Sequence, residues 1–236
     1  MILTIEQLTI RFAAPVVNRV SLSVAHGQRV ALVGESGCGK TVLALSLLGL
    51  LPQTARVEGT ACFSGQNLLD PAVVRSLRGR EIAMCWSNAE RYFNPVQRIG
   101  PQIDEAYSLH HPGKARLARD RTLELLRKMG FEDPWRVYKA YPSQLSGGMN
   151  QRAMIAMSLI NSPSLLLVDE PTRGLDDANR NRVLRCLADL EDVSMLIITH
   201  DMDLVEQLAH QAHFMRAGEL LHPDHPYARE LVRAGL

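Results

Sequence analysis

The sequence predicts an α/β protein with a parallel-sheet core, an antiparallel β edge and an inserted helical lobe. Short apolar runs at 28–33, 165–169 and 195–199 are bounded by polar residues, as expected for parallel strands covered on both faces. Apolar and polar residues alternate near the N-terminus, which predicts antiparallel strands. Between residues 99 and 160 helical spacing replaces these patterns. A chain of 236 residues is long enough to bury such a core.

The predicted elements follow in order along the chain. The predicted strands span residues 2–12, 16–24, 28–33, 60–63, 81–86, 165–169 and 195–199. The first two are joined by a turn near Pro15. The predicted helices cover 41–49, a segment with Leu117, Leu123, Leu125, Leu126 and Met129 that stops at Gly130, and 147–160. The chain alternates again at 212–222 and ends in a short helix from Pro226. We therefore expect one domain over residues 1–236, with a helical lobe at approximately 90–160.

Composition excludes several classes of protein. A net charge of +1 gives no reason to expect a nucleic-acid or anionic-membrane surface. The longest apolar stretch, Val42 to Leu51, is too short to cross a bilayer. No basic-then-apolar leader is visible, so we expect the chain to stay on the cytosolic side. The four cysteines are scattered, which indicates reduced thiols.

The segment after the strand at 28–33 fits the phosphate-binding pattern G-x-x-x-x-G-K-[ST] without a mismatch. The loop residues are Gly34, Glu35, Ser36, Gly37, Cys38, Gly39, Lys40 and Thr41. A strand before the loop and a helix after it form the context in which backbone N–H groups cradle phosphates. Lys40 would reach the β- and γ-phosphates, and Thr41 would place its hydroxyl on Mg²⁺. Cys38 is interpreted as a small residue that the loop tolerates, and we also expect a thiol alkylator to block nucleotide binding through it.

Two carboxylates end the apolar strand at 165–169. This context is that of a Walker B motif, in which Asp169 faces the Mg²⁺ held by Thr41. Glu170 would polarise the water that attacks the γ-phosphate. Such a strand end is weak evidence alone and becomes stronger behind a phosphate loop.

A second glycine segment precedes the predicted helix at 147–160. Ser146, Gly147 and Gly148 predict an N-cap and a second phosphate-facing helix N-terminus, on the helical lobe. One subunit cannot easily close both helix ends onto one nucleotide. Two subunits arranged head to tail can do so.

At this point the sequence resembles a family. Residues 34–41, 145–152 and 165–171, together with Gly174-Leu175-Asp176 and Thr199-His200-Asp201, resemble the ABC-transporter nucleotide-binding domain in its complete order. The resemblance implies that Ser146, Gly147 and Gly148 contact the γ-phosphate of the partner's ATP and that Asp176 lies at the dimer interface. It implies that His200 contacts the γ-phosphate and that Phe12 stacks on adenine. Catalysis would then rest on Glu170, His200 and Lys40, with ATP and Mg²⁺ bound.

Local features resemble the di-/oligopeptide and nickel importers. They are Leu47 to Pro52, Asn94-Pro95, Tyr141 to Leu145 and His225-Pro226-Tyr227. This branch implies a second ABC ATPase subunit, like or related, two membrane permease subunits and an external substrate-binding protein, with the chain peripheral at the cytoplasmic face. Peptide, nickel and metal-chelate cargo remain open, and the chain need not touch cargo. Members often carry a longer tail with an iron–sulfur centre. No cysteine follows Tyr227, so we expect no cluster.

One position departs from the family pattern. Counting back from Asn94, Ser87 occupies the place of a glutamine that normally reaches Mg²⁺ or the attacking water. The reach of serine is about 2–2.5 Å shorter. Either water fills the gap, which we favour, or this ATP site is weakened and the partner site supplies most turnover.

A competing function is open. The chain could be the ABC ATPase of a soluble multi-enzyme assembly, such as a phosphonate carbon–phosphorus lyase complex, rather than of a permease. A DNA-repair ATPase is disfavoured, since no coiled coil separates the motifs and no basic face stands out.

Overall fold

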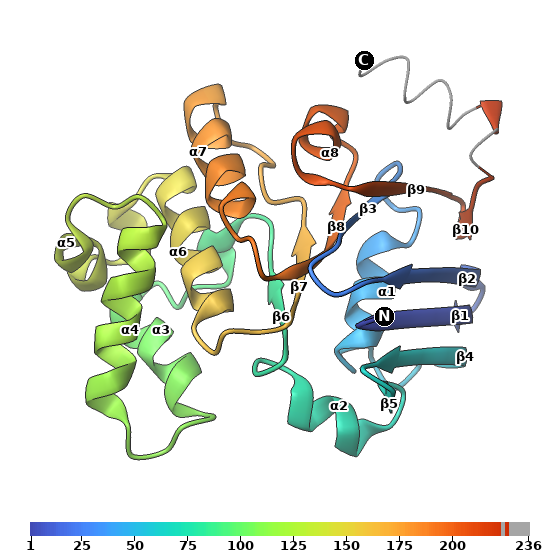
Figure 1. The fold of residues 1–236 in the computed structure, drawn as a ribbon, viewed down its shortest axis with the longest axis horizontal. Helices are drawn as coiled ribbons and strands as arrows, with labels where there is room; N and C mark the ends of the chain where they lie inside the picture. The colour runs from blue at the N-terminus through green and yellow to red at the C-terminus, as the bar shows by residue number, and fades with distance from the viewer. Residues whose placement is uncertain (223–224, 227–236) are drawn as a thin grey trace. The chain divides into compact units, whose positions relative to one another are not determined.

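The computed structural model describes residues 1–222 and 225–226 (Figure 1). The chain forms two compact units. Unit 1 combines Met1–Arg78 with the chain from Asp192 onward, and unit 2 is Gly79–Glu191. The short helix expected from Pro226, and Tyr227 of the family-like ending, lie outside the described residues.

Unit 1 contains an antiparallel sheet in the order β2-β1-β4-β5 (Figure 1). Its strands are β1(Leu3–Arg11), β2(Pro15–Val24), β4(Arg56–Phe63) and β5(Gln66–Asn67). The buried face of β1 changes phase, because Ile5 is followed by Leu8 and the register shifts between them. Gln7 absorbs the extra residue at φ 50°. The predicted β edge is present, with the turn at residues 12–14 and Pro15 already in β2.

Unit 1 also contains parallel strands. β3(Arg29–Val33) pairs in parallel with β8(Ser194–Thr199) on one side and β9(Gln211–Arg216) on the other. The short β10(Glu219–Leu220) pairs antiparallel with β9. Every residue of β8 is buried, which explains the apolar run between its terminal Ser194 and Thr199. The helices of this unit are α1(Lys40–Leu47), α2(Pro71–Leu77) and α8(Met202–Leu208).

Unit 2 pairs two buried parallel strands and adds a group of helices. The strands are β6(Ile82–Cys85) and β7(Leu165–Asp169). The helical elements are η1(Ala89–Arg91), α3(Ile99–Ser108), α4(Ala115–Lys128), α5(Pro134–Lys139), η2(Pro142–Gln144), α6(Gly147–Leu159) and α7(Asp177–Ala188). Helices α3, α4, α5 and α6 pack against one another (Figure 1).

Within the described residues, the predicted strands and helices form, with shifted ends. The strand expected at 60–63 begins earlier, at Arg56, because its first half is an exposed edge with a weak apolar pattern. Helices α2, α7 and α8 were not predicted. Both α2 and α8 have only seven residues, and α7 begins with a polar run, so hydrophobic spacing alone does not show them. Among the described residues no helix is long and apolar enough to span a bilayer.

Candidate nucleotide site

The phosphate loop connects β3 to α1 in unit 1. Gly39 has φ 109°, and an added Cβ there would lie 2.5 Å from the carbonyl oxygen of Val16. At Gly34 a Cβ would lie 2.2 Å from the carbonyl oxygen of Met215. Backbone from β2 and β9 therefore lies directly against the loop, and only glycine fits at these two positions. The two glycines of the pattern allow the loop to pass this close.

The Lys40 ammonium is held inside the loop. Lys40 is 5% exposed. Its Nζ donates to the carbonyl oxygens of Gly34 at 2.6 Å and Glu35 at 2.8 Å, and lies 3.7 Å from Cys38 Sγ. An ammonium has three donors, and a thiol is a weak acceptor. Of the three contacts, the one to Cys38 is therefore the weakest. A phosphate oxygen would replace Cys38 as the acceptor with the smallest loss of free energy.

The N-terminus of α1 faces the loop without a capping side chain. Gly39 is the N-cap and makes no side-chain cap hydrogen bond. A helix N-terminus left in this way attracts negative charge. Thr41 lies exposed in this turn, and Glu35, Ser36 and Gly37 are exposed in the loop. A close-fitting glycine loop, a buried ammonium and an uncapped helix suit a phosphate group.

His200 lies beside the start of the phosphate loop. β3 and β8 are paired in register, Val33 with Thr199, and the Gly34 N–H donates to the Thr199 carbonyl at 3.3 Å. Gly34 and His200 therefore follow paired residues at the same edge of the sheet. Asp201 caps α8 by accepting from the Leu204 N–H, which fixes the turn that presents the exposed His200. The sequence alone could not show this proximity, because Gly34 and His200 lie far apart along the chain.

Phe12 lies in the turn between β1 and β2, with 36% of its surface exposed. Its N–H donates to the Ala14 carbonyl at 3.1 Å. β2 begins shortly after this turn, and its Val16 carbonyl lies against the Gly39 position. An exposed ring is thus attached to the strand that lines the phosphate loop.

Unit 2 contains the two carboxylates at the end of β7. Asp169 is the last residue of the strand and is 6% exposed. Glu170 follows in the left-handed region at φ 45°, which is uncommon for a glutamate. The Arg173 N–H donates to the Glu170 carbonyl at 3.2 Å and closes the turn. A non-glycine residue held in this conformation often marks a functional position. The carboxylate oxygens of Asp169 are of the kind that Mg²⁺ prefers as ligands.

The second glycine segment forms the expected cap. Ser146 is the N-cap of α6, and its Oγ accepts from the Met149 N–H at 3.3 Å. Gly148 is buried against α7: an added Cβ would lie 2.5 Å from Asn179. Asn179 in turn donates from its backbone and its side chain to Asp176, at 2.8 Å each. These two hydrogen bonds lower the pKa of the Asp176 carboxyl.

The structure therefore brings Gly148 and Asp176 together through Asn179. Gly147 is different, because a Cβ there would meet only Leu175, at 3.6 Å. No local pattern of residues indicates that Asn179 links the two motifs.

The rest of this segment is buried and has structural contacts. Arg152 donates to the carbonyls of Met129 at 2.8 Å and Gly130 at 3.2 Å, just after α4, and its guanidinium lies 4.1 Å from the Phe131 ring centroid. Burial lowers the pKa of Arg152. The Asn150 amide donates to the Pro142 carbonyl at 2.9 Å. These side chains fix α6 to its surroundings.

Ser87 lies in a loop that Gln151 holds. The Gln151 amide donates to the Trp86 carbonyl at 2.8 Å and accepts from the Ala89 N–H at 3.4 Å. The Trp86 and Tyr92 rings stack at 4.9 Å between centroids. Ser87 itself is half-buried in the middle of this loop. The loop is therefore shaped by its neighbours, and the residue at position 87 can vary without changing those contacts.

A family model described as ABC transporter matches residues 17–173. The chain belongs to that family. The matched stretch includes the phosphate loop, the second glycine segment, which resembles the ABC signature, and the end of β7. The predicted class of enzyme, an ATPase, is thereby confirmed.

Relatives and solved structures agree with this assignment. The dipeptide transport ATP-binding protein DppD of Escherichia coli (strain K12) is 37% identical over 254 aligned residues, covering 99% of this chain and 78% of the relative. The probable peptide ABC transporter ATP-binding protein y4tR of Sinorhizobium fredii is 40% identical over 232 residues, covering 91% of this chain and 69% of the relative.

Two solved structures share the fold. A dimeric ATP-binding cassette, MJ0796, bound to ADP and Pi matches with a TM-score of 0.80 and 23% identity, covering 93% of this chain and 97% of that one. CbiO1 of Clostridium perfringens, described as part of the ABC transporter complex cbiONQ, matches with a TM-score of 0.81 and 21% identity, covering 98% and 92%. The predicted fold class, an α/β P-loop ABC ATPase core, is confirmed.

Proposed function

We propose that this chain is the ATP-hydrolysing subunit of an ABC importer for peptides. The observation that supports this most is the phosphate loop, in which a buried Lys40 ammonium and an uncapped α1 face an incoming anion. DppD and y4tR, which are named for dipeptide and peptide transport, favour peptide cargo over nickel or a metal-chelate. A second ABC ATPase subunit and two permease subunits would complete the transporter. The chain would then be peripheral at the cytoplasmic face of the membrane.

Each side chain of the proposed ATP site has a separate role. Lys40 and the loop N–H groups neutralise phosphate charge, and Phe12 stacks on adenine. The Thr41 hydroxyl and the Asp169 carboxylate would hold Mg²⁺, which when bound offsets the negative charge of the β- and γ-phosphates. His200, at the same sheet edge as Gly34, contacts the γ-phosphate.

Hydrolysis needs a base and a second subunit. Glu170 takes a proton from water as the water oxygen bonds to the γ-phosphorus and the bond to the bridging oxygen breaks, releasing ADP and phosphate. Ser146, Gly147 and Gly148 of a partner subunit complete the site, with Asp176 at the interface. We treat residues 1–236 as one nucleotide-binding domain with a helical lobe at about 90–160.

The variant Glu170→Gln tests the catalytic part. Glutamine keeps the size of glutamate and cannot take the proton, so ATP binding should persist while hydrolysis falls by about 100-fold or more. An ATP-bound dimer should accumulate on size exclusion. The matched control is Glu191→Gln, an exposed position outside the motifs. Normal hydrolysis by Glu170→Gln would remove this residue from the role of base.

Copurification tests the transport part. The chain would be tagged in its native host and extracted with its membranes in mild detergent. Two multi-spanning proteins and a second ABC ATPase are expected. Soluble enzymes without a permease would instead establish the carbon–phosphorus-lyase type of assembly and leave the ATP chemistry as proposed.

A further inference from the structure

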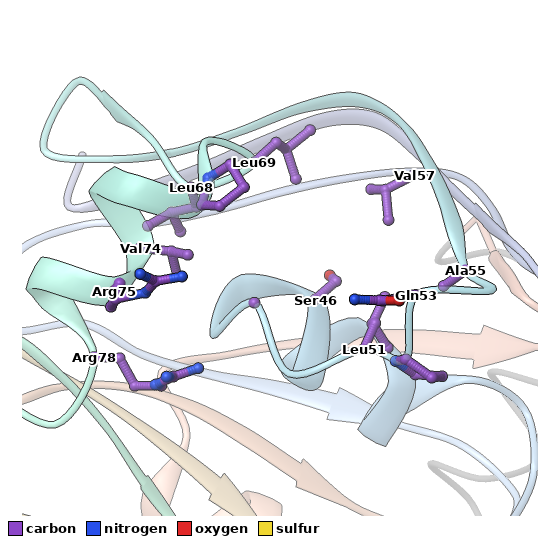
Figure 2. A pocket seen from close by; sticks show the side chains of 13 residues that line it. Ser46, Leu51, Gln53, Ala55, Val57, Leu68, Leu69, Val74, Arg75 and Arg78 are labelled. Atoms are coloured by element: carbon purple, nitrogen blue, oxygen red, sulfur yellow. The ribbon is translucent and has the colours of Figure 1, made fainter.

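Unit 1 contains a hollow of about 360 Å³ that the ATP site does not use. It lies between the C-terminal end of α1, the loop that follows, the start of β4, and α2 with the loop before it (Figure 2). None of the phosphate-loop residues 34–41 lines it. A volume of this size suits a small molecule.

The lining has apolar walls and a cationic side. Leu51, Val57 and Val74 contribute to the apolar surface. Arg75 lies in α2 and Arg78 is its C-cap, and no carboxylate is among the lining residues. Among the described residues, neither arginine takes part in an ion pair. Two positive charges therefore border the hollow without an acidic neighbour in its lining.

The cationic side is held in place by α1. Arg78 Nη1 donates to the Leu48 carbonyl at 3.1 Å, at the C-cap of α1. The turn after Leu48 packs closely on α2, since a Cβ at Gly49 would lie 2.7 Å from Val74 Cγ1. A guanidinium has five N–H donors in a planar fork, so Arg78 can keep this bond and still bind a carboxylate.

Further polar groups face the same space. Figure 2 shows the side chains of Arg75, on α2, and Arg78, just after it, extending toward the side of the hollow where Ser46 and Gln53 lie. Ser46 Oγ donates to the Leu43 carbonyl at 2.6 Å, which leaves its oxygen as an acceptor. A few polar groups converging on an otherwise apolar hollow are the usual composition of a small-molecule site.

We propose that this hollow binds a small amphipathic carboxylate. Its carboxylate would take bidentate hydrogen bonds from the arginine pair, and its apolar body would lie on Leu51, Val57 and Val74. A neutral molecule of the same shape would lack the negative charge that pairs with the two arginines, so it would bind more weakly. The site adjoins the C-terminal end of the helix whose first residue is Lys40, and it does not depend on the transport role proposed above.

The test uses octanoate as the probe and the full-length chain without nucleotide. Calorimetry should show saturable binding of octanoate at millimolar concentration and at least tenfold weaker binding of 1-octanol. Arg75→Gln and Arg78→Gln should each weaken octanoate binding by tenfold or more. Arg75 is exposed with no recorded contact, so its variant keeps the fold even if Arg78→Gln loses the Leu48 bond. ATP binding should be unchanged in Arg75→Gln.

The matched control is Arg56→Gln. Arg56 lies between the lining residues Ala55 and Val57, is exposed and does not line the hollow. It should bind octanoate as the unchanged chain does. Absence of saturable octanoate binding, equal binding of 1-octanol, or equal weakening by Arg56→Gln would each overturn the proposal.

Discussion

The phosphate loop and the ABC signature share a local structure and differ in how the helix N-terminus is capped. Both are glycine segments that lead into a helix N-terminus. Gly39 begins α1 with no side-chain cap, while Ser146 closes the first turn of α6 by accepting from Met149. Lys40 brings a positive charge into the loop. In the signature the charged side chain, Arg152, is committed to the carbonyls after α4.

This difference shows how much each segment can do alone. The phosphate loop has its ammonium and its free helix end within one unit. The signature uses most of its side chains to fix α6, and presents mainly the Ser146 hydroxyl and glycine backbone. We therefore expect the first to bind nucleotide in an isolated subunit and the second to act only when a partner closes on it.

The largest expected effect comes from Lys40→Met. Losing two charge-assisted contacts to phosphate, at about 1.5–3 kcal/mol each, should weaken ATP binding by at least about 100-fold. Fluorescent ATP titration measures this, and Lys128→Met, on an exposed helix face, is the control. ATP binding that survives Lys40→Met would mean that the loop backbone alone supplies the affinity.

Alkylation of Cys38 should also block ATP binding, because its Sγ lies 3.7 Å from the Lys40 ammonium. Cys85, beside the signature helix, should resist the reagent at pH 8, since burial raises the pKa of its thiol to about 12 and leaves it protonated. Half-buried Cys62 should react first. Peptide mass spectrometry with parallel binding assays checks the order. Full ATP binding after stoichiometric labelling of Cys38 would refute the first expectation.

The variants Gly148→Ala and Gly147→Ala distinguish a glycine that is needed for packing against α7 from one that is not. The first places a methyl 2.5 Å from Asn179 and should cost about 1–3 kcal/mol of unfolding free energy. The second has 3.6 Å of room and should leave stability unchanged. Thermal unfolding and ATPase assays are measured on both. Equal stability of the two variants would show that the Asn179 side chain can move away and make room for the methyl group.

The smallest effect is expected from Ser87→Gln. Gln151 and the Trp86–Tyr92 stack hold this loop without Ser87, and water can bridge the shorter side chain. ATPase and transport rates should then stay within about twofold. A substantial rise would support the alternative, in which the partner site supplies most turnover.

The local pattern alone determined much of this protein. Strand, glycine loop and helix around Lys40 were predicted to within a residue or two, because backbone geometry and hydrophobic spacing are local properties. The buried strands that end at Asp169 and Thr199 were predicted equally well from their apolar runs. The short α2 and polar α7 were not, since seven residues or a polar run give no clear period.

Only the tertiary structure decided the contacts between distant segments. The pairing of Val33 with Thr199 places His200 beside Gly34, and Asn179 joins Gly148 to Asp176. The packing of α2 on the turn after α1 assembles Arg75 and Arg78 beside an apolar hollow. Such contacts depend on strand register and close packing across long stretches of chain, which no local pattern of residues encodes.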